Sequence, residues 1–150
     1  MEVQLTDNTL SKAPPVSLGE LIKLPAGLSG FPETQTFSLL CTDDYWPYYL
    51  LRPCNNDQSQ ILVIEPGGWV PGYSPMISKS DANWLDIYDS RDALFLNLIN
   101  IVSFENEEVY IDLKNPIVLN RNNLVGRQLT LKNAEDYSNP QRLIVQSNAV

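Results

Sequence analysis

The chain has 150 residues, of which 18 are acidic and 10 are basic, with two cysteines and no histidine. This length suits one domain that buries about 70% of the surface of its unfolded chain without a metal or a disulfide. The net charge of -8 argues against direct binding to nucleic acid, because phosphate binding relies on clustered lysine and arginine.

The sequence carries no signal for a membrane or for secretion. No uninterrupted apolar run reaches the roughly 18 residues that a membrane-spanning helix needs. Residues 1–7 lack the basic and apolar regions of a secretory signal. We therefore expect a cytoplasmic protein.

Metal binding is not expected either, because without histidine the two cysteines cannot complete a zinc site of the usual kind. In a cytoplasmic protein, Cys41 and Cys54 are expected to be small, buried and reduced side chains. Neither a metal nor any other cofactor is therefore expected.

The two ends of the chain are its least regular parts. Val3 and Leu5 are compatible with a strand, but Ala13-Pro14-Pro15 interrupts any regular structure, so residues 1–17 are expected to form a poorly structured arm. Leu18–Leu24 is compatible with one strand. We expect a single domain over residues 18–146 and a frayed end at residues 147–150.

The stretch from Ala93 to Leu131 predicts the centre of a sheet. Its first run, Ala93–Ser103, alternates two sets of apolar side chains, which is typical of a strand buried on both faces. One face is expected to carry Leu94, Leu96 and Leu98, and the other Phe95, Ile99 and Ile101. We therefore place this strand at the centre of the sheet.

Shorter strand-like runs follow within the same stretch. A turn at Glu105–Glu107 favours a hairpin to a run that alternates apolar and polar residues. Proline cannot donate a backbone hydrogen bond, so Pro116 fits at the start of the next strand, and a last run begins at Gly126. The apolar positions of these runs are Val109, Ile111, Leu113, Ile117, Val118, Leu119, Leu129 and Leu131. Their succession predicts a β-meander.

One short helix is expected over Ser80–Tyr88, with Ser80 as its N-cap and Asp81 in its first turn. A short helix is stable only when its apolar face packs against the rest of the protein. Trp84 is therefore expected to cover the sheet rather than to form a platform for a ligand. Together with the period-2 runs, this predicts a mainly β fold: a compact, antiparallel, barrel-like single domain with one short helix.

A series of short motifs runs in order from Leu24 to Leu131. The motifs are LPAGLSGFPE (24–33), FSLL (37–40), YYLL (48–51), ILVIEP (61–66), WVPGY (69–73), DAL (92–94), PIVLN (116–120) and GRQ (126–128). In this order they resemble the FliW family of bacterial flagellar assembly factors, and the order of many motifs is more specific than any one of them. The chain departs from the family at Gly72, which replaces an acidic residue, and at Gly67-Gly68, which replaces apolar positions.

The resemblance implies a function in protein binding. It implies that the chain binds the translational repressor CsrA, relieves repression of flagellin synthesis, and binds flagellin itself. Catalysis is not expected, because the absence of histidine excludes Ser-His-Asp and Cys-His arrangements and leaves only carboxylates. The candidate carboxylates, Asp43-Asp44, Asp86 with Asp89, and Glu105–Glu108, lie at predicted loops or turns, where acidic residues are ordinarily solvated.

The partner surface is expected on two segments rich in glycine and proline, which hold aromatic side chains rigidly at the rim of a sheet. Its expected residues are Trp69, Val70, Pro71 and Tyr73, together with Phe31 and Pro32. A structural role for Trp69, folded back on the core, is equally compatible with the sequence. A second class of function is also open, a β module that binds carbohydrate or another ligand on exposed aromatic rings.

Overall fold

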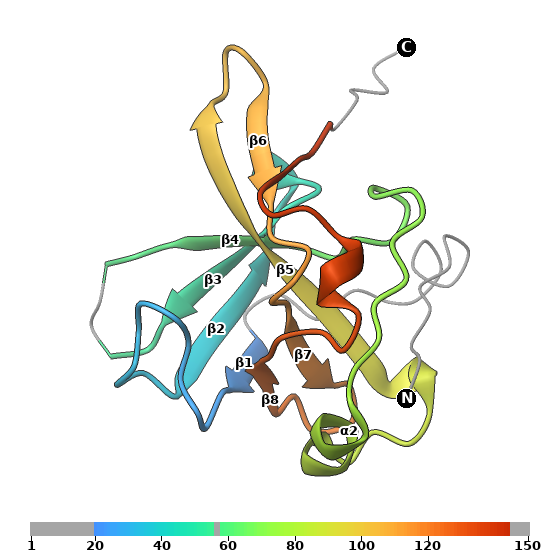
Figure 1. Cartoon of the computed structure of the whole chain (residues 1–150). Helices are drawn as coiled ribbons and strands as arrows, with labels where there is room; N and C mark the ends of the chain where they lie inside the picture. The colour runs from blue at the N-terminus through green and yellow to red at the C-terminus, as the bar shows by residue number, and fades with distance from the viewer. Residues whose placement is uncertain (1–19, 56–57, 145–150) are drawn as a thin grey trace.

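The computed structural model describes residues 20–55 and 58–144 (Figure 1). Its strands are β1 (Glu20–Lys23), β2 (Thr36–Cys41), β3 (Tyr49–Pro53), β4 (Ile61–Ile64), β5 (Ala93–Ser103), β6 (Glu108–Ile111), β7 (Ile117–Asn120), β8 (Gly126–Gln128) and β9 (Gln141–Arg142). The helical elements of this part are α2 (Lys79–Leu85) and the short 3-10 turns η1 (Asp43–Tyr45), η2 (Ser90–Asp92) and η3 (Ala134–Asp136). The arm at residues 1–17 and the frayed end at residues 147–150 lie outside the described residues and stay predictions.

Strand β5 joins the two halves of the sheet, in which all the paired strands are antiparallel. Strands β1 to β5 pair in chain order, and β8 and β9 pair with β7 and β6. β5 itself pairs with β7 through Ala93–Leu96, with β4 at Asn97 and Leu98, and with β6 between Ile99 and Ser103. The central position predicted for Ala93–Ser103 is therefore confirmed.

The predicted β-meander is wrong at one step, because β6 pairs with β5 and β9 but not with β7. Ile111 lies opposite Ile99, and Ile117 lies opposite Leu96. The returning chain therefore advances by six residues while it passes only three residues of β5. The extra residues turn away from the ladder, where the Asp112 carboxylate accepts hydrogen bonds from the backbone N–H groups of Lys114 and Asn115. Strands β6 and β7 are consequently separate partners of β5.

The sheet curls but does not close into a barrel. Only an isolated bridge between Lys23 and Val125 links β1 to the turn before β8 in the described part, with a 3.0 Å hydrogen bond from Lys23 N to Leu124 O. The mainly β, antiparallel fold with a single short α-helix is confirmed for the residues that the structure describes.

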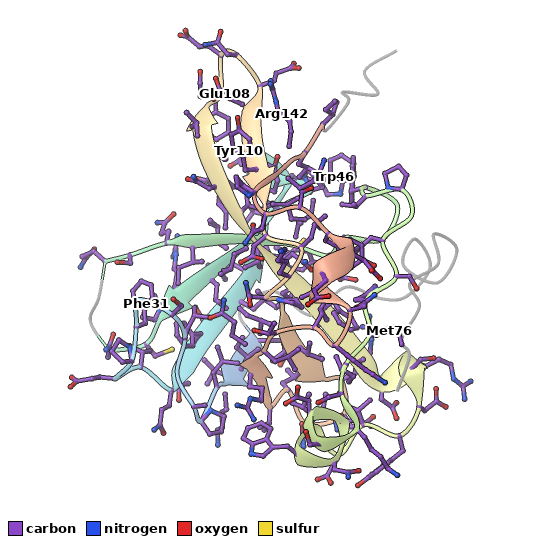
Figure 2. The ribbon with its side chains drawn as sticks, viewed as in Figure 1. Phe31, Trp46, Met76, Glu108, Tyr110 and Arg142 are labelled. Atoms are coloured by element: carbon purple, nitrogen blue, oxygen red, sulfur yellow. The ribbon has the colours of Figure 1, made fainter. Side chains whose placement is uncertain are left out.

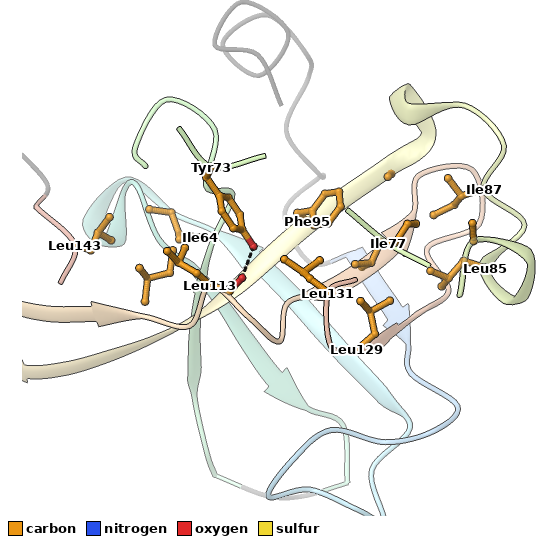
Figure 3. Packing of buried hydrophobic residues seen from close by; sticks show 14 of the residues in the cluster. Ile64, Tyr73, Ile77, Leu85, Ile87, Phe95, Leu113, Leu129, Leu131 and Leu143 are labelled. Carbon is orange, nitrogen blue, oxygen red and sulfur yellow. Dashed lines mark hydrogen bonds between the residues drawn. The ribbon is translucent and has the colours of Figure 1, made fainter. Parts of the chain in front are cut away.

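The two faces of β5 pack into two hydrophobic clusters. Ala93 and Phe95 belong to the first cluster, which Figure 3 shows running from Leu143 past Tyr73 and Phe95 to Leu85 and Ile87. Leu94 and Leu96 belong to the second cluster, under β1 to β4. Full burial of such side chains stabilises a fold by roughly 1.5–3 kcal/mol each. The predicted burial of β5 on both faces is thus confirmed for its first half.

Helix α2 begins earlier than the sequence predicts. Its N-cap is Ser78, whose Oγ accepts a 3.1 Å hydrogen bond from Asp81 N, and the chain leaves the helix at Asp86 with a φ of 56°. The buried helical residues are Ala82 and Leu85, which lie three positions apart on one face. Trp84 is 45% exposed, so its predicted position over the sheet is wrong. In the described part of the chain, no helix is long and apolar enough to cross a membrane.

Both cysteines are free, as predicted. Cys41 is half-buried at the end of β2. Cys54 is exposed, contrary to the prediction, because it follows the last residue of β3 and lies in the loop beyond it.

Candidate partner-binding surface

The predicted loop from Trp69 to Tyr73 is a pair of tight turns directly after β4. The N–H groups of Trp69 and Val70 both donate to the carbonyl oxygen of Pro66, at 3.0 and 3.1 Å, and Tyr73 N donates to Val70 O at 3.2 Å. Gly72 has a φ of 77°, a conformation that glycine adopts without strain. The loop surrounds a hollow of about 240 Å³. Pro71 is exposed, whereas Trp69 and Val70 are half-buried against the first cluster.

Tyr73 is a core residue, contrary to its predicted place on the partner surface. Its side chain is only 7% exposed, and its ring packs at 4.8 Å against Tyr137. Its hydroxyl donates a 2.8 Å hydrogen bond to the carbonyl oxygen of Leu113 (Figure 3). Burial raises the pKa of Tyr73 above its ordinary value. Sequence reasoning missed this because the partner lies 40 residues further along the chain.

The second predicted segment lies on another part of the molecule. Phe31 is half-buried, and its ring meets the Phe37 ring edge-on at 6.4 Å, within the second cluster. Pro32 is exposed. In Figure 2, Phe31 is well separated from Trp46, which packs against Trp69. The structure therefore does not bring the two predicted segments together.

The Trp69–Tyr73 loop instead lies next to η1, through a contact between Trp46 and Trp69. The sequence analysis did not assign η1 to the partner surface. Trp46, directly after η1, is 61% exposed, and its ring lies 5.4 Å from the Trp69 ring. Tyr45 beside it is exposed, as are Asp43 and Asp44. We call Tyr45, Trp46, Trp69, Val70 and Pro71 the aromatic surface. The sequence signal was an aromatic pair placed between two acidic residues and a proline, a composition typical of an exposed turn.

A half-buried carboxylate anchors the start of the loop. Glu65 accepts a 2.9 Å hydrogen bond from the Tyr49 hydroxyl, and Arg121 Nη2 lies 3.8 Å from its other oxygen. Burial raises the pKa of Glu65, and the hydrogen bond and Arg121 act in the opposite direction. These contacts hold the end of β4 against β3 and the end of β7.

Most of the acidic residues considered for catalysis are exposed at turns or paired with a basic neighbour. Asp89 is bound by its neighbour Arg91, whose hydrogen bonds lower the pKa of Asp89 to about 2. Asp43 and Asp44 are exposed on η1, and Glu105 and Glu107 are exposed between β5 and β6. Within residues 20–55 and 58–144, no group of three or more histidine, cysteine and acidic side chains is placed to hold a metal ion.

The fold and this surface define the class of the protein, a small antiparallel β-domain that exposes paired aromatic rings of the kind enriched in protein interfaces. A model of the family described as "FliW protein" matches residues 7–143. The chain belongs to the FliW family.

Relatives agree with this assignment. The chain is 27% identical over 114 residues to the flagellar assembly factor FliW of Geotalea uraniireducens, covering 76% of this chain and 69% of the relative. It is 30% identical over 115 residues to that of Borrelia hermsii, covering 75% of this chain and 85% of the relative. A solved structure, titled "Crystal structure of the flagellar assembly factor FliW", shares the fold with a TM-score of 0.70 at 21% identity, over 96% of this chain and 95% of that one.

Proposed function

We propose that this protein is a cytoplasmic, non-enzymatic flagellar assembly factor that binds and antagonises the translational repressor CsrA and also binds flagellin. Membership of the FliW family supports the role in flagellar assembly, since the relatives carry that description. The two partners follow from what the family resemblance implies.

The observation that carries a binding role is the Trp46–Trp69 pair. The ring of Trp46 is 61% exposed although a large aromatic side chain gains free energy by burial, so a partner that covers it removes apolar area from water. Tryptophan is also among the residues that contribute most to binding free energy at protein interfaces. We therefore place CsrA binding on the aromatic surface.

The negative charge beside the aromatic surface also favours CsrA binding there. Asp43 and Asp44 flank the aromatic surface, and the whole chain has a net charge of -8. A repressor that binds RNA presents a basic surface, which these carboxylates attract. Attraction of this kind speeds encounter more than it holds a complex together, so raising the salt concentration should slow association more than it speeds dissociation.

The carbohydrate-binding alternative is less well supported by the geometry. The planes of the Trp46 and Trp69 rings meet at 71°, so the two rings do not form one flat platform. A sugar stacked on Trp46 would therefore gain no second coplanar ring from Trp69.

The proposal is tested by calorimetric titration of the protein with CsrA, and separately with flagellin, from the same host. Trp46→Ala should weaken CsrA binding by about 2 kcal/mol and leave the melting temperature unchanged, because the side chain is exposed. Trp69→Ala should weaken binding by a similar amount and also lower stability, because Trp69 packs against the core.

The matched control is Trp84→Ala, which removes another exposed tryptophan on a different element. It should leave CsrA binding unchanged. Equal affinity of the wild type and Trp46→Ala would place the contact elsewhere. Absence of binding to both partners would contradict the proposed function itself.

A further inference from the structure

In the part of the chain that the structure describes, one face of the second half of β5 is largely exposed. Leu94, Leu96 and Leu98 alternate onto the side of the second cluster, where Leu94 and Leu96 are fully buried. Leu98 is only half-buried against this cluster, and Asn100, the next residue on the same face, is exposed. Val102, the next apolar residue on the same face, is 59% exposed. The apolar face therefore continues beyond the described residues that cover it.

This uncovered face forms a groove. The cavity measures about 390 Å³. It is lined by residues of β5 and β6 that include Leu98, Ile99, Val102, Tyr110 and Ile111, together with Asp112 and the Asn139-Pro140 segment. The β5–β6 hairpin projects from the rest of the sheet, with Glu108, Tyr110 and Arg142 along it (Figures 1 and 2). We call the groove and these lining residues the outer hairpin face.

The outer hairpin face is separate from the aromatic surface. Ile99 and Ile101 alternate to the opposite side of β5, where they pack against the first cluster together with Trp69 and Val70. The groove lining and the aromatic surface have no residue in common, and neither Val102 nor Tyr110 packs against the first cluster. Substitutions at Val102 and Tyr110 therefore leave every residue of the aromatic surface in place.

The groove lies beside a strand edge that can form backbone hydrogen bonds. From Asn100 to Ser103, β5 has β6 along one edge, and no strand of the described residues pairs with its other edge. An exposed strand edge is a template for an added extended segment, which gains affinity from main-chain hydrogen bonds and specificity from alternate side chains.

The charge around the groove indicates what kind of segment fits. Residues 103–112 include four acidic residues, Glu105, Glu107, Glu108 and Asp112, and no basic one. Arg142 lies across from Tyr110, but its guanidinium donates to the carbonyl oxygens of Asn106 and Glu107, at 3.4 and 3.2 Å. The Glu105 and Glu107 carboxylates are exposed. A second copy of this chain would bring the same negative charge to the groove, whereas a basic segment would complement it.

We propose that the outer hairpin face is a docking site for an extended protein segment in which apolar and basic residues alternate. The apolar side chains enter the groove over Val102 and Tyr110, and the negative charge of the hairpin attracts the lysine or arginine side chains. This is a second binding surface, beyond the proposed function of the aromatic surface.

The test uses fluorescence anisotropy with synthetic peptides of about ten residues, long enough to form one extended strand. One peptide alternates lysine with valine, and its control alternates lysine with serine, at equal charge. The wild-type protein should bind the valine peptide at least about tenfold more tightly, because only valine gains from burial in the groove. A glutamate–valine peptide should not bind.

The decisive variant is Val102→Ser with Tyr110→Ala, which keeps the charge and changes side chains that are exposed or half-buried. Val102→Ser alone serves if the double variant melts at a lower temperature. Either variant should remove the difference between the two lysine peptides, whereas Trp46→Ala should retain it. Equal binding of both lysine peptides by the wild type, or a difference that persists in the variants, overturns the proposal. So does a wild-type dimer in sedimentation that the variants convert to a monomer, since the occupant would then be a second copy.

Discussion

Tyr73→Phe isolates one buried hydrogen-bonding group that links the loop after β4 to the returning chain. The hydroxyl donates to Leu113 O at 2.8 Å and accepts from Asn97 Nδ2 at 3.1 Å. Phenylalanine keeps the ring, its packing against Tyr137 and nearly all of its volume, so no large cavity forms. The Leu113 carbonyl loses its donor at a buried site, which costs about 1–3 kcal/mol. The Asn97 side chain loses only one of its two hydrogen bonds, because Nδ2 also donates to Asp112 O at 2.8 Å.

We therefore expect Tyr73→Phe to lower the free energy of unfolding by about 2 kcal/mol. For a chain of this size the melting temperature should fall by roughly 4–8 °C. Urea unfolding, followed by circular dichroism, measures the free-energy change. The control is Tyr88→Phe, at a side chain that is 71% exposed, and it should change stability by less than about 0.5 kcal/mol. A Tyr73→Phe protein as stable as the wild type would refute the assignment of this hydroxyl to the core.

Three other outcomes are expected. Gly126→Ala should destabilise the fold by about 3 kcal/mol in urea unfolding, because the new Cβ would lie 2.9 Å from Leu119 Cα and still closer to the Val118 carbonyl, which forces β8 away from β7. Burial raises the pKa of Glu65, so the folded state binds its proton more tightly than the unfolded state, and ionisation of Glu65 costs stability above its folded pKa. The stability of the wild type relative to Glu65→Gln should therefore rise as the pH falls from about 7 to about 4, and a constant difference would contradict the raised pKa of Glu65. A chelator should leave the melting temperature unchanged, since the described residues offer no metal-binding cluster, and a large drop would show a bound metal.

The sequence predicts those parts of the fold that depend on local alternation. Ala93–Ser103 alternates two apolar sets, and the structure shows that strand with the same bounds. The pairing beyond it depends on Asp112–Pro116, whose outward turn no periodicity indicates. The start of α2 was misplaced because Ser78 and Ser80 are both chemically suitable N-caps, and the fold places Ser78 there.

The candidate site was less predictable, because its side chains meet through long-range packing. Trp46 and Trp69 are 23 positions apart and belong to separate loops, so their 5.4 Å contact has no local sequence signal. Tyr73 shares the glycine- and proline-rich segment of Trp69, yet its hydroxyl has a partner in the core. The composition of a loop thus predicts rigidity and apolar character but does not predict which of its side chains point outward.

Asn97 shows how the interrupted return of the chain is accommodated. It is a fully buried polar residue in an apolar strand, at the point where β5 changes partners from β7 to β6. The extra residues between β6 and β7 leave the carbonyl groups of Asp112 and Leu113 without partners in the ladder, and a buried carbonyl without a donor is costly. The Asn97 side chain donates a hydrogen bond to the carbonyl oxygen of Asp112, and the Tyr73 hydroxyl donates one to that of Leu113. The two side chains are also hydrogen-bonded to each other. Both polar groups therefore lie in the core because the sheet is interrupted there, and that interruption lets the β5–β6 hairpin extend beyond the body of the sheet.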